Sequence, residues 1–309
     1  MVRTVARMPG VAFLLVALAI AFAFFASGFA SLPNLLNIGV QSSILLLLAL
    51  PMTFIIMTEG LDLSMGAVLG LTGVVLASML VAGNSLAVAF AAALGVGLVF
   101  GVANGLFVVK LGLPPFVATL GTLGIAQGIA LVMTNGESVV GIGPALPRLY
   151  ATTWLGIPFS ILVAVLIYAI FHFLLYYTRF GNYVFAIGGN REALVLAGVP
   201  AGFFHVSVYA LAGLMAGFAA LLLTGRMNSG HPIAAMGMEF DAIAAVIAGG
   251  TERQRGNGWL PGTVLGVLTV GVLRNGLNVL AMPSSLQVAS IGLLLITALL
   301  IDSMRRRRS

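Results

Sequence analysis

Residues 11–30 read VAFLLVALAIAFAFFASGFA, a run without a single charged side chain. A helix needs about 20 apolar residues to cross a hydrocarbon core roughly 30 Å thick, so this run is long enough to span a bilayer. Arg3 and Arg7 precede it, as basic residues precede a cleaved signal peptide, but the apolar core of such a peptide is only about 7–15 residues long. We therefore predict that the run is a retained membrane span.

Apolar runs of this kind recur along the whole chain, separated by short polar breaks. The others lie at residues 38–58, 64–82, 86–108, 115–133, 154–177, 203–223, 240–251, 259–280 and 286–303. Of the 309 residues 61% are hydrophobic and only 7% are charged, whereas a soluble domain carries about 25% charged residues. The sequence predicts an all-α protein, a polytopic transmembrane helical bundle of about ten spans in which residues 1–309 form a single transmembrane domain.

The run at residues 240–251 is the exception, because it is too short for a plain span and Glu239 and Asp241 interrupt its start. Irregular backbone at membrane depth is tolerated only where it is buried in protein or lines a water-filled cavity. We expect this eighth element to be either tilted, or a broken helix that is covered by protein.

The basic residues orient the bundle. With the N-terminus inside and ten crossings, eleven of the fourteen Lys and Arg residues fall on the cytoplasmic side, as the positive-inside rule predicts. Arg148 and Arg226 fall outside, and Arg274 lies within a span. We expect both termini to be cytoplasmic.

Several function classes lack their sequence signals. The chain has no cysteine, and its three histidines form no H-E-x-x-H pair, so no metal site is predicted. The only lysine, Lys110, is followed by Leu111 and belongs to no phosphate-binding loop, so the chain is not its own ATPase. No Ser-His-acid motif is present, and the net charge of +6 reflects topology rather than nucleic-acid binding. Transport is therefore the leading class, with no catalytic residue and no cofactor.

Six segments carry a family resemblance. They are TEGLDLSMG at residues 58–66, GVANG at 101–105 with PFVATLG at 115–121, FGNYVFAIGGNREALVLAG at 180–198, EFDAIAAV at 239–246 and NGLN at 275–278. Together they resemble the permease subunits of ribose-type ATP-binding-cassette (ABC) importers, in the branched-chain amino acid and sugar permease superfamily. Two places depart from the family pattern: residues 251–258 read TERQRGNG where T-S-L-A-G-G-x-G is usual, and Arg274 stands where an uncharged polar residue is common. The first could reflect a different ATPase surface, and the second could alter the solute path.

The resemblance implies a type II ABC importer-like fold and a subunit that translocates a monosaccharide or similar small polar solute without catalysing a reaction itself. Its implied partners are a cytoplasmic ABC ATPase that binds the ATP, a second permease copy or homologue, and a periplasmic or surface-tethered solute-binding protein. The implied location is the inner membrane of a bacterial cell. Homodimer or heterodimer, and the solute itself, stay open.

The connection at residues 179–200 is the longest one on the cytoplasmic side, and its stretch 191–197 is a short-helix candidate with capping residues at both ends. The resemblance implies that this loop docks into a groove on the ATPase, although a solvated turn is the alternative. The candidate coupling residues are Gly188, Gly189, Asn190, Arg191, Glu192, Ala193 and Gly198.

Candidates for the solute path come from polar and aromatic residues within spans. Phe116, Thr119 and Thr122 share part of one helical face, and Asn275 and Asn278 are further candidates on the ninth span. Hydrogen bonds between helices are an equally weighted role for the two threonines.

Two acids, Asp62 and Asp241, each precede a helix rich in small residues, where a carboxylate can cap the helix start. Gating or solute contact is the alternative role, because charges at membrane depth are costly and commonly functional. The patterns Glu59-x-x-Asp62 and Glu239-x-Asp241 lie about five spans apart, which is compatible with an inverted repeat.

Two other functions stay open at this point. A cation-coupled secondary transporter would use Glu59, Asp62, Glu239 or Asp241 as its ion site. A non-transporting membrane scaffold is disfavoured by the interrupted eighth element and by the polar residues at depth.

Overall fold

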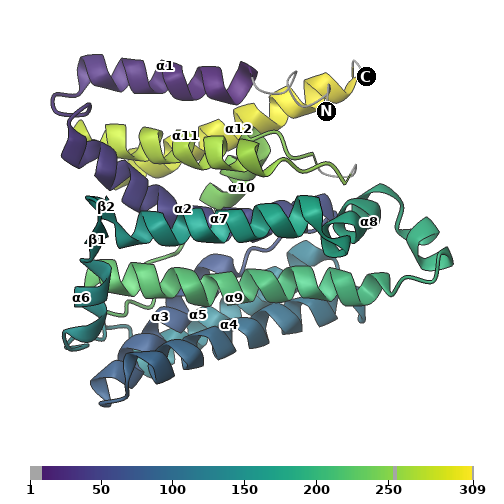
Figure 1. Cartoon of the computed structure of the whole chain (residues 1–309), viewed down its shortest axis with the longest axis horizontal. Helices are drawn as coiled ribbons and strands as arrows, with labels where there is room; N and C mark the ends of the chain where they lie inside the picture. Colours follow the sequence, from purple (N-terminus) through teal and green to yellow (C-terminus); the bar gives the residue numbers. More distant parts are fainter. Residues whose placement is uncertain (1–8, 253–255, 308–309) are drawn as a thin grey trace.

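The computed structural model describes residues 9–252 and 256–307; Arg3, Arg7, Arg253, Arg255 and Arg308 of the charge argument lie outside the described residues. Twelve helices and one small hairpin occur in the described part, and they form one bundle (Figure 1). The helices are α1 Pro9–Phe25, α2 Leu32–Met57, α3 Met65–Val81, α4 Leu86–Val109, α5 Pro115–Thr134, α6 Ala145–Tyr150, α7 Phe159–Tyr177, α8 Arg179–Leu196, α9 Ala201–Met227, α10 Met238–Ala248, α11 Leu260–Val279 and α12 Ser284–Arg307; the strands are β1 Thr153–Trp154 and β2 Ile157–Pro158.

Six of these helices, α2, α4, α5, α7, α9 and α11, are long and apolar enough to cross a membrane. Shorter apolar helices cover residues 10–25, 65–81 and 284–294. A polytopic helical membrane protein is therefore confirmed, and each of the ten predicted runs corresponds to one helix.

The sixth run does not begin where the sequence suggested. Residues 153–158 form the hairpin β1–β2 instead of the first turn of a helix, and α7 starts only at Phe159. Leu155 and Gly156 at the tip both have positive φ, as the type I′ turn of a two-residue hairpin requires.

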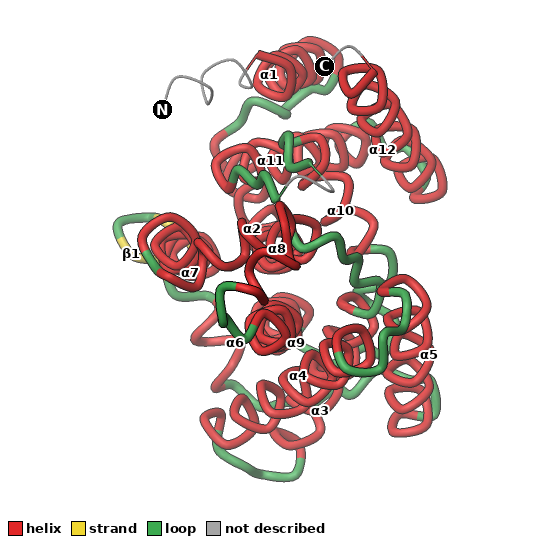
Figure 2. Tube along the Cα trace, turned by 90° about the vertical axis from the view of Figure 1, so that its right-hand side faces the viewer, coloured by secondary structure: helices red, strands yellow, loops and turns green. Residues whose placement is uncertain are grey.

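The two ends of the bundle differ (Figure 1). The hairpin and α6 lie at one end, which we call the α6 end; α8 lies at the other, the α8 end, where α1 also begins and α12 finishes. Viewed from the α8 end, α1, α11 and α12 lie on one side of α2, and α3, α4 and α5 lie on the other (Figure 2). Residues 42–57 of α2 are all buried, which makes this helix the core of the bundle.

Helices α4 and α9 are packed through glycines. A Cβ atom at Gly97 of α4 would meet the carbonyl oxygen of Gly213 on α9, and one at Gly213 would meet the backbone of Gly97 and Gly101. In lipid, where apolar burial does not drive helices together, small residues allow the backbone approach that holds them.

The chain between α9 and α10 is not helical and lies along α3. A Cβ atom at Gly70 would lie 2.8 Å from the carbonyl oxygen of Pro232, and one at Gly230 would lie 2.8 Å from that of Gly73. Residues 230–237 therefore run antiparallel to α3, with Pro232 and Ala235 buried and Ile233 and Met236 exposed, and α10 follows as a helix of only 11 residues. The expectation of a short element covered by its neighbours agrees with this arrangement.

Candidate functional site

The starts of α3 and α10 meet inside the bundle, and both carry carboxylates. Before α3 the chain leaves the helical conformation at residues 58–64, with Glu59 at a φ of 65°. Asp62 is 1% exposed, and its Oδ1 accepts hydrogen bonds from the Ser64 N–H at 2.8 Å and the Ser64 hydroxyl at 2.6 Å. Its carboxylate therefore fixes the turn that leads into α3.

A chain of buried hydrogen bonds continues from Ser64 to two other helices. Asn104 of α4 donates its side-chain N–H to the Ser64 hydroxyl at 2.8 Å, and the Thr122 hydroxyl of α5 donates to the Asn104 side-chain oxygen at 2.6 Å. We call Asp62, Ser64, Asn104 and Thr122 the Asp62 network. It joins the start of α3 to α4 and α5, within the protein, where unpaired polar groups are costly.

Thr119 lies next to this network. Its hydroxyl donates to the Pro115 carbonyl at 2.8 Å and accepts from the Leu63 N–H at 3.2 Å. Thr119 and Thr122 are thus placed between helices in this structure, whereas Phe116, on the same helix, is 52% exposed. A role of these three residues in a solute path stays a prediction.

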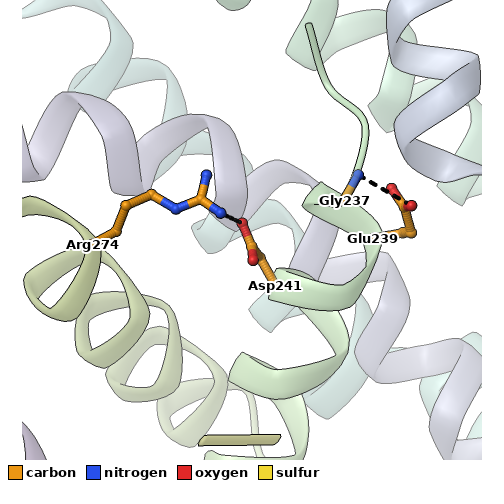
Figure 3. Close-up of polar contacts among 4 residues, drawn as sticks. All are labelled: Gly237, Glu239, Asp241 and Arg274. Carbon is orange, nitrogen blue, oxygen red and sulfur yellow. Dashed lines mark hydrogen bonds and ion pairs between the residues drawn. The ribbon is translucent and has the colours of Figure 1, made fainter. Parts of the chain in front are cut away.

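At the start of α10 two acids point to opposite sides of the helix (Figure 3). Glu239 accepts a hydrogen bond from the Gly237 N–H at 3.2 Å, and a Cβ atom at Gly66 of α3 would meet its other carboxylate oxygen. Asp241 forms an ion pair with Arg274 of α11, with 2.7 Å between Nη2 and Oδ2 (Figure 3). The Asp241 side chain is 6% exposed and that of Arg274 is 37% exposed. Such a pair holds α10 against α11, and loss of one partner would leave a charge in a poorly solvated place.

A cavity of about 180 Å³ opens beside this ion pair. It lies among α2, α9, the segment before α10, and α11, and its polar lining consists of Gln41, Ser42, Arg226, Asp241 and Arg274. Nε of Arg274 and Oγ of Ser42 are buried and have no hydrogen-bond partner within the described residues.

The two asparagines predicted on the ninth span have different surroundings. Asn275 exchanges two side-chain hydrogen bonds with Asn34 of α2, at 2.9 and 3.0 Å, and is buried. Asn278 is exposed near the end of α11. The first therefore joins two helices in this structure.

The predicted coupling residues lie in and after α8. Asn190 breaks this helix with φ −157° and ψ 89°, and its side-chain oxygen accepts from the Ala193 N–H at 2.9 Å, so a short second helical piece begins there. Gly198, at φ 78°, follows its end. A Cβ atom at Gly188 would meet the Met57 carbonyl of α2 and the Gly256 backbone, whereas the four positions from 189 to 192 are exposed.

No group of three or more His, Asp or Glu side chains that could hold a metal ion occurs among the residues that the structure describes.

The comparisons with known proteins fit this arrangement. A family model described as branched-chain amino acid transport system / permease component matches residues 34–299. The chain belongs to this permease family. It is a membrane transport component and not an enzyme, since the ATPase of such importers is a separate subunit.

Three curated relatives match this permease over most of their length. The ribose import permease protein RbsC of Bacillus subtilis is 38% identical over 87% of this chain and 84% of its own. The D-allose transport system permease protein AlsC of Escherichia coli is 36% identical over 87% of this chain and 83% of its own. The L-arabinose ABC transporter permease protein AraH of Azospirillum brasilense is 31% identical over 84% of this chain and 77% of its own. No solved structure matches the chain.

Sequence reasoning missed two parts of the permease site. Asn104 carried a detectable signal, because an amide within an apolar span is a candidate for a hydrogen bond between helices. Arg274 was noted as a charged residue within a span, but its pairing with Asp241 was not assigned, since no local pattern relates residues 33 positions apart.

Proposed function

We propose that the chain is the membrane-spanning permease subunit of an ATP-driven ABC importer that moves a monosaccharide or similar small polar solute into a bacterial cell. The observation that carries the proposal is the match to the ribose permease of Bacillus subtilis, at 38% identity over 87% of this chain. The relatives named for D-allose and L-arabinose extend the same solute class.

The proposed topology has ten crossings, with the α8 end in the cytoplasm and the chain in the inner membrane. Lys110 follows α4, and Arg179 and Arg191 lie in α8, whereas Arg148 lies in α6 and Arg226 near the end of α9. This distribution of charge between the two ends supports the assignment, because basic residues accumulate on the cytoplasmic side. Both termini are then cytoplasmic.

An inverted repeat is part of the proposal. A long helix, a non-helical segment and a shorter helix occur in α2–α3 and again in α9–α10. The starts of α3 and α10 meet at Gly66 and Glu239. Broken helices that meet within the membrane are typical of the substrate region in transporters built from such repeats.

We assign ATPase docking to the second piece of α8. Leu194 is buried against the protein, but Val195 is 55% and Leu196 is 88% exposed, which leaves apolar side chains available to a cytoplasmic partner. Gly188 contacts the end of α2, and α2 leads directly into the turn held by Asp62. Closure of two ATPase subunits on two permease copies would reach the membrane interior by this route.

Replacing Ala193 with tryptophan tests the docking role. We expect ATP hydrolysis to continue while ATP-driven uptake falls to background, because a bulky side chain on the exposed face of α8 blocks the fit to the ATPase. Ala151→Trp, on an exposed position at the α6 end, is the matched control and should leave uptake unchanged. Normal uptake by a well-expressed Ala193→Trp variant would contradict the role.

Reconstitution tests the proposed function as a whole. The permease is placed in proteoliposomes with its ATPase and solute-binding protein, and uptake of a labelled pentose or hexose is measured with and without ATP. We expect uptake to require ATP, the ATPase and the binding protein. Uptake driven by an ion gradient without the ATPase would instead show a secondary transporter, and no dependence of any uptake on the chain would show a scaffold.

A further inference from the structure

The cavity beside Asp241 and Arg274, which we call the Arg274 cavity, has an unusually polar lining for the interior of a membrane bundle. Its polar lining is Gln41, Ser42, Arg226, Asp241 and Arg274, as described above. Arg226 lies in the last turn of α9, and Arg274 lies five residues before Val279, the last residue of α11. Both helices finish toward the α6 end, so the cavity occupies the half of the bundle that faces outward in the proposed topology (Figure 1).

The charges that line the cavity do not cancel. Two guanidinium groups, Arg226 and Arg274, face one carboxylate, Asp241, which leaves an excess of one positive charge. Arg226 has no ion pair among the residues that the structure describes. Glu239 does not line the cavity, because its carboxylate lies against Gly66 of α3 on the other side of α10 (Figure 3).

Two buried donors on the cavity wall also lack acceptors. Nε of Arg274 has none within the described part of the chain, although Nη2 of the same group is paired with Asp241. Oγ of Ser42 has no partner there either. Buried polar atoms of this kind are rare in proteins, and both could be satisfied by the oxygen atoms of one molecule in the cavity.

The size of the cavity restricts what that molecule can be. Its volume of about 180 Å³ is several times what one water molecule needs, but it is smaller than the roughly 300–1,000 Å³ of sites for larger ligands. A single small polar molecule is therefore the appropriate scale.

We propose that the Arg274 cavity is a solute site of the permease that selects a monosaccharide carrying one carboxylate, such as a uronic acid. The inference rests on the proposed function, within which it names the solute class. The guanidinium groups of Arg274 and Arg226 bind the carboxylate, since the planar fork of arginine matches this group. Ser42 and Gln41 bond to ring oxygens and hydroxyls, and Asp241 holds Arg274 in place.

A monoanion fits better than a sugar phosphate. One carboxylate cancels the single excess positive charge of the lining, whereas a phosphate monoester carries about −1.5 to −2 charges at pH 7 and would leave the site negative.

The test uses the purified full-length permease in detergent and two matched pairs of probes. D-Glucuronate and D-glucose, like D-galacturonate and D-galactose, differ only in a carboxylate or a hydroxymethyl group at one carbon. We expect at least one uronate to raise the thermal unfolding temperature with a saturable dose dependence at constant ionic strength, and neither neutral hexose to do so, because a ligand stabilises the state that binds it.

Variants assign the binding to the cavity. Arg274→Asn should weaken uronate binding about tenfold or more, the usual consequence of losing a charged hydrogen-bond partner. Arg148→Asn, on an exposed position of α6, removes the same charge outside the cavity and should bind as the wild type does. If Arg274→Asn does not fold, Arg226→Gln, at an exposed position on the cavity rim, should weaken uronate binding as well.

Three results would overturn the inference: no stabilisation by either uronate, equal stabilisation by sodium acetate, or undiminished uronate binding to folded Arg274→Asn and Arg226→Gln proteins. The proposed function is tested separately in the reconstituted importer. ATP-driven uptake of a neutral sugar that uronates do not inhibit would support the proposed function and contradict the carboxylate site. Absence of any ATP-driven uptake would count against the function even if purified permease bound a uronate.

Discussion

Two contacts in this permease are both built on glycine, but they bring together different groups. Where α4 crosses α9, Gly97 and Gly101 of one helix face Gly213 of the other, and backbone meets backbone there. Where α3 meets the chain around α10, Gly66 faces the carboxylate of Glu239, and Gly70 faces the carbonyl of Pro232 in a non-helical segment. The first contact joins two complete helices, and the second joins a helix to a broken one.

The difference separates packing from mechanism. Close backbone approach between helices supplies van der Waals attraction and does not require polar side chains. The second contact places the carboxylate of Glu239 against the backbone of α3, and on the opposite side of α10 Asp241 pairs with Arg274 of α11. Both acids lie inside the bundle, at a cost in desolvation that packing alone would not require. We expect changes at the first contact to reduce folding and changes at the second to affect transport more than folding.

The largest effect is expected at the α4–α9 crossing. Gly97→Leu should prevent recovery of folded permease, because its side chain would enter the Gly213 backbone on the facing helix. The cost should exceed the roughly 1–3 kcal/mol of an ordinary overpacked core, where side chains can move aside. Gly95→Leu is the control two residues along α4, where a Cβ atom meets nothing within 4 Å. The yield of monodisperse protein in detergent measures both, and a normal yield for Gly97→Leu would show that the helices can separate without loss of the fold.

An intermediate effect is expected at the ion pair on α10. Asp241→Asn leaves Arg274 without its partner and should lower the free energy of unfolding by about 1–3 kcal/mol in an SDS titration. This is less than the roughly 3–5 kcal/mol for breaking a fully buried pair, because the Arg274 side chain is 37% exposed. Adding Arg274→Asn to Asp241→Asn removes the remaining charge and should restore part of the stability but not the transport. If the double variant is as unstable as the sum of the two single ones, the two residues do not interact.

The bundle itself was readable from the sequence because a bilayer imposes its thickness on each span. Each of the ten apolar runs in the sequence corresponds to one helix of the structure. The eighth run, now α10, was expected to be irregular from its length and from Glu239 and Asp241. The hairpin at residues 153–158 was not recognised, since Leu155 and Ile157 continue the apolar pattern of the following helix. Apolar residues in a short loop carry the same signal as the start of a span.

The site was less predictable because its contacts are not local. Asp62 and Asp241 were selected as acids that precede helices, but Asp241 lies within the first turn of α10 and pairs with Arg274 on another helix. The Asp62 network joins residues 40 and 18 positions apart. Thr119 and Thr122 illustrate the limit from the other direction. Their spacing places them on one helical face, and only the packing decides that this face meets Leu63 and Asn104 instead of an open path.

The smallest effect is expected within the Asp62 network, where one threonine can be compared with another. Thr122→Val removes a hydrogen bond from α5 to Asn104 of α4, whereas Thr72→Val removes only bonds to carbonyl groups of its own helix. Hydrogen bonds between helices in membranes contribute about 0.6 kcal/mol on average, so Thr122→Val should lower the free energy of unfolding by roughly that amount and Thr72→Val by less. Valine keeps the shape of threonine, so the comparison measures the hydroxyl alone. Equal losses in the two variants would mean that the network adds no stability of its own. A loss of transport in Thr122→Val beyond its small loss of stability would place Thr122 in the mechanism rather than in the packing.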